Sequence, residues 1–164
     1  MPEREVISNT SPLLYLHQIG QLDLLPKLYG RVVIPPAVRK ELRTGAERGF
    51  STPDVDQIHW LDVRMPTDMT LLPMAIDLGA GEAEAIALAL ASPRHLLILD
   101  DGLGRRIAHL LALTYTGTMG MLVRAKQEGH LAAVRPVIEA LQNRTSMRLR
   151  GGLIEWVLRA AGEG

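Results

Sequence analysis

Cysteine is absent from the 164 residues of this chain, and aromatic residues make up only 4% of them. The lack of cysteine excludes disulfides, thiolate metal sites and cysteine nucleophiles, and it fits a reducing compartment. Because hydrophobic residues still make up 47% of the chain, its core must be aliphatic. We expect one domain over residues 1–164, in which 143–164 form a basic loop and a C-terminal helix.

Long apolar runs are also lacking, since none approaches the ~18 residues of a membrane span. The first residues, MPEREVISN, have neither the basic start nor the apolar core of a signal peptide. These two absences predict a soluble, cytoplasmic protein with no membrane partner.

Net charge is the third absence, because 18 Lys and Arg balance 18 Asp and Glu. The charges are nevertheless uneven along the chain. Nine acids stand against three arginines between Glu41 and Ala91, and nine basic residues stand against four acids between Arg94 and Arg150. A metal-dependent enzyme acting on a polyanion needs both, acids for the metal and bases for the phosphates. Scattered surface charge is the alternative interpretation.

Short apolar or β-branched runs alternate with helical patterns, which favours a parallel sheet flanked by helices. The predicted strands are 5–8, 31–34, 58–63, 96–99 and 113–116. Predicted helices begin at Pro12, after a cap at Thr10 or Ser11, and at the pair Pro35-Pro36. Further helices are expected at 22–29, 82–90, 102–111, 117–129, 134–142 and 153–161, with a mobile basic loop at 143–152.

Polar side chains follow two of these strands directly. Asn9 comes after the first strand, and Asp100 and Asp101 come after the buried run LLIL. In a parallel sheet the functional crevice lies outside the carboxyl ends of the strands, so these residues fall on one edge. Glu82, at a helix start one connection upstream, is placed to face them.

Carboxylates gathered at one edge repel each other unless a cation lies among them. Oxygen ligands without sulfur favour Mg²⁺ or Mn²⁺, and such an ion can activate a water for phosphodiester hydrolysis. Each acid has a plainer interpretation as well. One of the two aspartates can cap the next helix, Glu82 can stabilise a helix start, and Glu41 and Glu84 can be exposed helical charges. The five histidines, which have no ligand spacing, are interpreted as structural.

Five motifs occur in an order that carries a family resemblance. They are V-I-S-N-T-S-P-L-L near the start, V-I-P-P-A-V-R-K-E-L at 33–42, L-G-A-G-E-A-E-A-I-A-L-A at 78–89, L-L-I-L-D-D-G-L-G-R-R-I-A at 96–108 and G-T-M-G-M-L at 117–122. Together they resemble the DUF3368 branch of the PIN-like nuclease superfamily, relatives of VapC-type toxins. The resemblance implies a three-layer α/β/α fold with a central, mostly parallel sheet and an acidic Mg²⁺ or Mn²⁺ pocket. It also implies cleavage of single-stranded RNA, often by the toxin of a toxin–antitoxin pair.

Carried over by position, the resemblance places the catalytic pocket at Asn9, Glu41, Glu82, Asp100 and Asp101. Asn9, Glu82 and either aspartate would bind the metal, and Ser11 would support position 9 by hydrogen bonding. The chain departs from the family at Asn9, where the pattern has Asp. Asparagine removes a full negative charge from the metal site, so it weakens the expected binding of Mg²⁺.

Three functions remain open at this point. The first is a metal-dependent endoribonuclease. The second is a catalytically weakened RNA- or protein-binding module, favoured by Asn9 and the basic 144–150 segment. The third, a small-molecule or phosphate-binding module, rests only on the glycines near Glu82. Apolar positions on the last helix, Leu153, Trp156 and Val157, pack against the domain, against a homodimer mate or against a small antitoxin.

Overall fold

A computed structural model describes residues 4–70 and 77–164 and shows a five-stranded sheet in the order β3-β2-β1-β4-β5. The strands are β1 (Glu5–Ser8), β2 (Val32–Ile34), β3 (Leu61–Val63), β4 (His95–Ile98) and β5 (Tyr115–Thr116). Every neighbouring pair is parallel. The predicted parallel sheet is therefore confirmed, and each observed strand lies on or within one residue of a predicted run.

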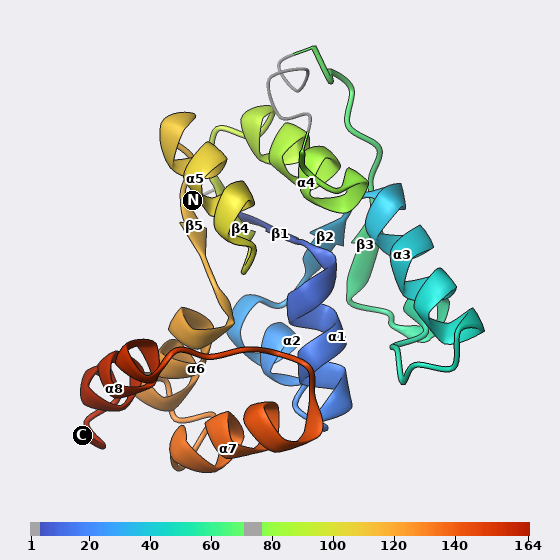
Figure 1. Ribbon diagram of the computed structural model, residues 1–164. Coiled ribbons are helices and arrows are strands. Elements are labelled where there is room, and N and C mark those ends of the chain that lie inside the picture. The colour runs from blue at the N-terminus through green and yellow to red at the C-terminus, as the bar shows by residue number, and fades with distance from the viewer. Residues whose placement is uncertain (1–3, 71–76) are drawn as a thin grey trace.

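Helices cover both faces of the sheet, which confirms the three-layer α/β/α architecture. The helices are α1 (Thr10–Gln18), α2 (Leu24–Tyr29), α3 (Pro36–Glu47), α4 (Ala80–Leu90), α5 (Gly102–Leu110), α6 (Thr118–Gln127), α7 (Arg135–Arg144) and α8 (Gly151–Ala160). Figure 1 shows α4 and α5 on one side of the strands and α1, α2, α6, α7 and α8 on the other. None of the helices in the described ranges is long and apolar enough to cross a membrane.

Alternate residues of the strands belong to two separate hydrophobic cores. Ile7 and Leu97 pack with the alanine-rich face of α4, whereas their neighbours Val6 and Leu96 join the larger core beneath the other helices. Because side chains alternate across a strand, a run such as LLIL must be apolar throughout when both faces are covered. The continuous apolar run at 96–99 has this cause.

The start of α1 differs from the prediction. The helix begins at Thr10, with Asn9 at the N-cap position, so Pro12 occupies the third helical residue rather than the first. Proline is tolerated there because the first four N–H groups of a helix have no partner within it. The Thr10 hydroxyl does not cap the helix and instead donates to Glu41.

The basic segment near the C-terminus is shorter than predicted, because α7 continues to Arg144 and α8 already begins at Gly151. Met147 and Leu149, in the connection between them, pack against the larger core. On α8, Val157 is fully buried, which confirms domain packing for that residue. Leu153 and Trp156 are 40% and 57% exposed, so they do not pack fully against the domain.

Strand order creates a single switch point. From the central β1 the chain proceeds to β2 and β3 on one side, and then returns to add β4 and β5 on the other side. Ser8 of β1 is in register with Ile98 of β4, and the Asn9 N–H donates to the Ile98 carbonyl at 3.1 Å. The fold thus brings positions 9 and 100 together, at the place where open α/β sheets bind ligands.

Candidate active site

Asn9 directly follows β1 at the switch point, and its side chain is buried, because the residue is only 2% exposed. Its backbone carbonyl accepts a hydrogen bond from the Ser8 hydroxyl at 2.9 Å. Its side chain hydrogen-bonds Glu82 and lowers the pKa of that carboxyl. Ser11, predicted to support position 9, lies half-buried in the first turn of α1, and no hydrogen bond within the described residues joins it to Asn9. Position 9 is held by Ser8 and by the sheet.

Glu82 reaches back over the start of α4, where its Oε2 accepts from the Gly79 N–H at 2.6 Å. Burial raises the pKa of this carboxyl, and the negative charges of Asp101 and Glu41 raise it further. The hydrogen bonds from Gly79 and Asn9 oppose this rise only in part. Glu82 therefore stabilises the start of α4, which was its plainer interpretation, and it also lies near other acids.

Glu41 joins three helices. Its Oε2 accepts from the Thr10 hydroxyl of α1, and its Oε1 accepts from the Gly81 N–H of α4 at 3.0 Å. A Cβ at position 81 would lie 2.7 Å from Glu41 Oε2, so glycine is what lets the carboxylate approach. The interpretation of Glu41 as a merely exposed helical charge is wrong, because tertiary contacts hold it beside Glu82.

The two aspartates after β4 have different surroundings. Asp101 is the N-cap of α5 and accepts from the Gly104 N–H at 2.8 Å, while its charge acts on Glu82. Asp100 turns to α6, where it accepts from the N–H and the hydroxyl of Thr118 at 2.7 and 2.6 Å. Burial raises the pKa of Asp100, although Thr118 and the nearby Arg105 oppose the rise.

The acids consequently form an arc along the carboxyl edge of the sheet. The charges of Asp101 and Glu41 both act on Glu82, whereas Asp100 lies on the β5 side with Thr118 and Arg105. In residues 4–70 and 77–164, no group of three or more acids and histidines is close enough to enclose a metal ion. The candidate donors are nevertheless all oxygens, and hydrogen bonds offset the repulsion at Glu82 only in part. That set fits a hard divalent ion held by a few carboxylates and water, not a closed protein cage.

Sequence reasoning missed Thr10, Thr118 and Arg105. Thr118 comes two residues after the end of β5, so the strand-end rule that selected Asn9 and Asp100 would have found it too. The bond from Thr10 to Glu41 joins residues far apart in the sequence, and no local pattern indicates it.

Glu84 and His95 have structural roles. Glu84 was expected to be a solvated surface charge, but it is partly buried, and burial raises its pKa against a hydrogen bond from the Ala37 N–H. It is thus not a fully solvated charge. His95 lies with its Nδ1 2.8 Å from the Ser92 carbonyl, and its Nε2 accepts from the Thr114 N–H at 3.0 Å, as expected for a structural histidine.

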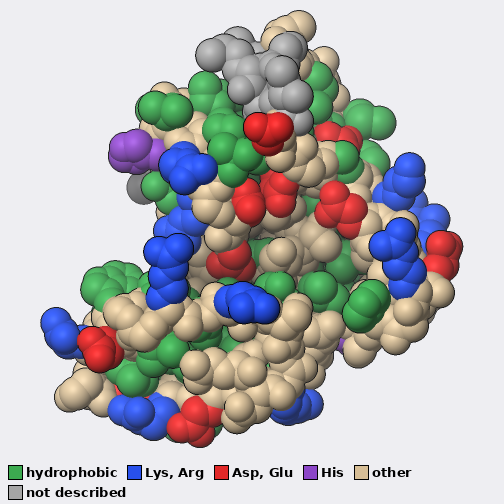
Figure 2. Space-filling view, in the orientation of Figure 1, with side chains coloured by type: hydrophobic (Ala, Val, Ile, Leu, Met, Phe, Trp, Pro, Cys, Tyr) green, Lys and Arg blue, Asp and Glu red, His purple; other side chains and the backbone are tan. Residues whose placement is uncertain are grey.

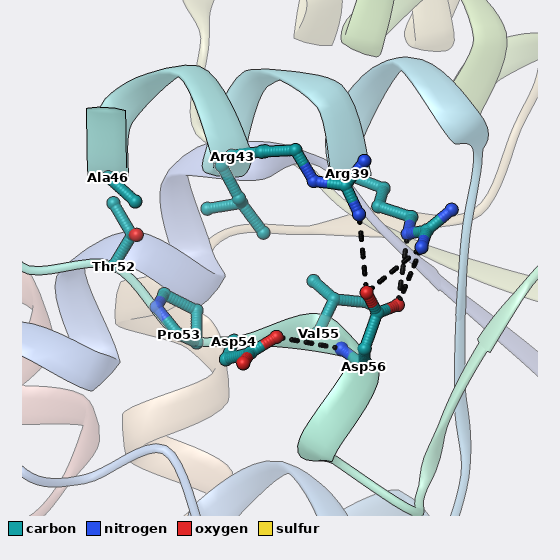
Figure 3. A pocket seen from close by; sticks show the side chains of 9 residues that line it. Arg39, Arg43, Ala46, Thr52, Pro53, Asp54, Val55 and Asp56 are labelled. Atoms are coloured by element: carbon teal, nitrogen blue, oxygen red, sulfur yellow. Dashed lines mark hydrogen bonds and ion pairs between the residues drawn. The ribbon is translucent and has the colours of Figure 1, made fainter. Parts of the chain in front are cut away.

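Figure 2 shows acidic side chains gathered in the middle of one face, with Lys and Arg side chains to either side. The hollow of about 370 Å³ in Figure 3 lies away from these acids, between α3 and the segment 52–56. There Arg39 and Arg43 both bind Asp56, at 2.8 and 3.2 Å. Its cations are already neutralised, so this hollow is a weaker candidate site than the sheet edge.

Comparison with known proteins gives one match. The family model described as DUF3368, PIN domain, matches residues 5–163 of this chain. No curated protein and no solved structure matches it. The matched range contains every residue of the acidic arc.

Proposed function

Because the chain belongs to the DUF3368 family of PIN domains, as its five motifs indicated, we propose that it is a metal-dependent endoribonuclease that cleaves single-stranded RNA. The family has a nuclease-type fold, and PIN domains generally depend on a divalent metal. RNA as the substrate, and Mg²⁺ or Mn²⁺ as the metal, are the parts that we add.

The convergence of acids at the switch point is the observation that carries the proposal. Burial raises the pKa of Glu82, and the negative charges of Asp101 and Glu41 raise it further. A cation would relieve this repulsion, and Glu82 with Asp101 or Asp100 would hold it. When bound, Mg²⁺ or Mn²⁺ supplies an activated water and stabilises charge on the phosphodiester.

The remaining residues position these groups. Thr10 and Gly81 fix the Glu41 carboxylate, and Thr118 fixes Asp100. Arg105, which lies beside Asp100, offers a positive charge at the edge of the arc, where a phosphate oxygen can be bound. Asn9 occupies the position at which the family pattern has aspartate, but it lacks the negative charge.

The test is cleavage of a labelled single-stranded RNA with Mn²⁺, with and without EDTA, by the protein and by Asn9→Asp. We expect EDTA-sensitive cleavage that is at least about tenfold faster in Asn9→Asp. Changes outside the ligand shell alone alter metal affinity or activity by about 10–100-fold, and this variant adds a charged ligand. An Asn9→Asp, Glu82→Gln double variant controls for contaminating nuclease. Absence of EDTA-sensitive cleavage by both proteins would reject the nuclease.

The contact between Asn9 and Glu82 favours a second candidate, a catalytically weakened RNA- or protein-binding module. The Asn9 amide donates to the carboxylate and so supplies part of the positive charge that an ion would bring. Salt-dependent RNA binding without turnover by either protein would favour this module.

For a protein partner, we propose that α8 binds a second copy of the chain, with a small antitoxin as the alternative. The exposure of Leu153 and Trp156 supports a covered surface there. Light scattering should give a dimer mass that falls to a monomer mass in Trp156→Ala. A monomeric protein that co-purifies with a small partner would support the antitoxin instead.

A further inference from the structure

One face of α3 leads from the acidic arc into a groove that the proposed function does not use. Ala37, Glu41, Thr44 and Arg48 recur every three or four residues and therefore share a face of the helix. Together with Lys40, Phe50 and Ala80 they line a hollow of about 410 Å³, which we call the Phe50 groove. Glu41 belongs to both the groove and the arc, so the two are continuous.

The end of α3 holds Phe50 over this groove. The Phe50 N–H donates to the Gly45 carbonyl and the Gly49 N–H donates to the Ala46 carbonyl, both at 3.0 Å. These two bonds, with Gly49 at φ +87°, form the Schellman motif that commonly ends a helix. The apolar residue of such a motif usually packs on the last turn, yet Phe50 is 63% exposed. Its backbone is fixed while its ring remains accessible.

The cations of the groove differ from those on the other face of the same helix. Arg39 and Arg43 point to Asp56, as Figure 3 shows, and both form ion pairs with it. Lys40 and Arg48 are exposed, and no ion pair within the described residues involves either of them. Within the described residues, the groove thus offers two cations, Lys40 and Arg48, that form no ion pair.

We propose that the Phe50 groove binds the segment of single-stranded RNA next to the cleaved bond, with a base stacked on Phe50 and phosphates at Lys40 and Arg48. An accessible aromatic ring beside free cations is the arrangement with which proteins bind single strands. Seven residues separate Arg48 from Glu41, which at ~1.5 Å per helical residue is about 10 Å along α3. The substrate class rests on the proposed function, whereas binding at the groove does not require cleavage.

Binding is therefore measured without turnover, by fluorescence anisotropy of a labelled oligoribonucleotide in EDTA. Phe50→Ala and Phe50→Leu should weaken binding at least about fivefold, and Phe50→Trp should retain it. Leucine keeps a large apolar side chain at position 50, so a loss of binding in Phe50→Leu would be specific to the aromatic ring. Circular dichroism checks that each variant is folded.

Arg48→Ala and Arg43→Ala form a matched pair, because each removes one cation from α3. Arg48→Ala should weaken RNA binding. It should also reduce the slope of log Kd against log salt concentration by about 0.7, the value for one phosphate contact on a single strand. Arg43→Ala, on the ion-paired face, should leave both unchanged. Equal effects of the two changes would show general electrostatics and would overturn the proposal. RNA binding by Phe50→Leu that equals the unchanged protein would also overturn it and point to a protein partner.

The two proposals can fail separately. RNA binding that depends on Phe50 without EDTA-sensitive cleavage supports the groove and rejects the nuclease. EDTA-sensitive cleavage supports the nuclease even if changes at Phe50 and Arg48 alter neither RNA binding nor the cleavage rate. That result would reject the groove as the binding site.

Discussion

At the scale of single residues, Asp101 combines two roles that substitutions can separate. It caps α5 through the Gly104 N–H, and its charge faces Glu82. Asparagine caps a helix about as well as aspartate, whereas replacement of a cap by alanine costs about 0.5–2 kcal/mol. Asp101→Asn should therefore unfold in urea like the unchanged protein but lose RNA cleavage, and Asp101→Ala should lose both. If Asp101→Asn cleaves at the normal rate, Asp101 is only a cap, and Asp100 becomes the candidate ligand.

Glu82 gives the folded protein a dependence on pH. Burial and the neighbouring charges raise its pKa above the ordinary 4.5, so the folded state binds this proton more tightly than the unfolded state does. The protonated Glu82 side chain therefore stabilises the folded state. This contribution is complete below pH 4.5, and it is lost as the pH rises through the raised pKa of the folded state. Glu82→Gln should then be more stable than the unchanged protein at pH 7 and unfold at a higher temperature. The gain in free energy of unfolding should be less than about 1 kcal/mol, because solvent screens the partly exposed group.

The melting temperatures of the two proteins, measured without divalent metal from pH 4 to 8, check this expectation. The gain from Glu82→Gln should shrink toward acid pH. A gain that is constant with pH would show that the carboxylate charge is not its cause. Asp62→Asn, at a carboxyl whose pKa is lowered by Arg31, is a control that should instead destabilise at neutral pH.

At the scale of elements, two glycines at the starts of helices should respond oppositely to alanine. Gly152, in the first turn of α8, has open space around its position, so Gly152→Ala should stabilise the protein by up to about 1 kcal/mol through helix propensity. At Gly81 of α4, the added Cβ would lie within 2.7–3.0 Å of the Glu41 carboxyl atoms. Gly81→Ala should displace Glu41, cancel the propensity gain and reduce cleavage.

Urea denaturation and RNA cleavage of these two variants measure the difference. Gly152→Ala should cleave RNA at the normal rate. If Gly81→Ala is as stable and active as Gly152→Ala, the contact of Glu41 with α4 has no functional role.

The elements themselves were predictable because their signals are local. Glu5–Ser8 and the run LLIL are strands by their apolar pattern, and Pro35-Pro36 begins a helix because proline fits the first helical turn. The placement of positions 9 and 100 at one edge also followed, since parallel strands bring their carboxyl ends together. The family resemblance added Glu41, which charge and spacing alone described as exposed.

Contacts across the fold were not predictable in this way. The distinction between Asp100 and Asp101 depends on which helix each side chain meets, and the sequence places both at one strand end. The sequence described Glu84 as a surface charge because of its spacing from Glu82. In the fold, the start of α3, which is distant in the sequence, lies beside Glu84. The start of α1 was misplaced because the bond from Asn9 to β4 sets it, not the local capping residues.

At the scale of the whole molecule, the fold turns an uneven charge sequence into a spatial division. Acids from α3, α4 and the end of β4 lie at the switch point, while Lys40 and Arg48 lie along α3 and Arg105 lies beside Asp100. Net charge is zero, so no overall field attracts a polyanion. Under the proposed function, RNA binding depends on these local groups, and its salt dependence should match the small number of phosphates that they contact.

The divalent metal should stabilise the whole fold, because the folded state alone brings the acids together. An ion at 100 times its Kd adds about 2.7 kcal/mol, which corresponds to a rise of about 5–10 °C in Tm for a chain of this size. We expect Mn²⁺ to raise the Tm of the unchanged protein, and to raise that of Asn9→Asp more at the same concentration, since the added carboxylate binds the ion more tightly. Differential scanning fluorimetry with and without EDTA measures both shifts. Glu82→Gln should lose most of the shift, whereas Asp56→Asn, in the hollow of Figure 3, should keep it. An equal shift in Glu82→Gln would place the ion elsewhere and remove the acidic arc as the metal site.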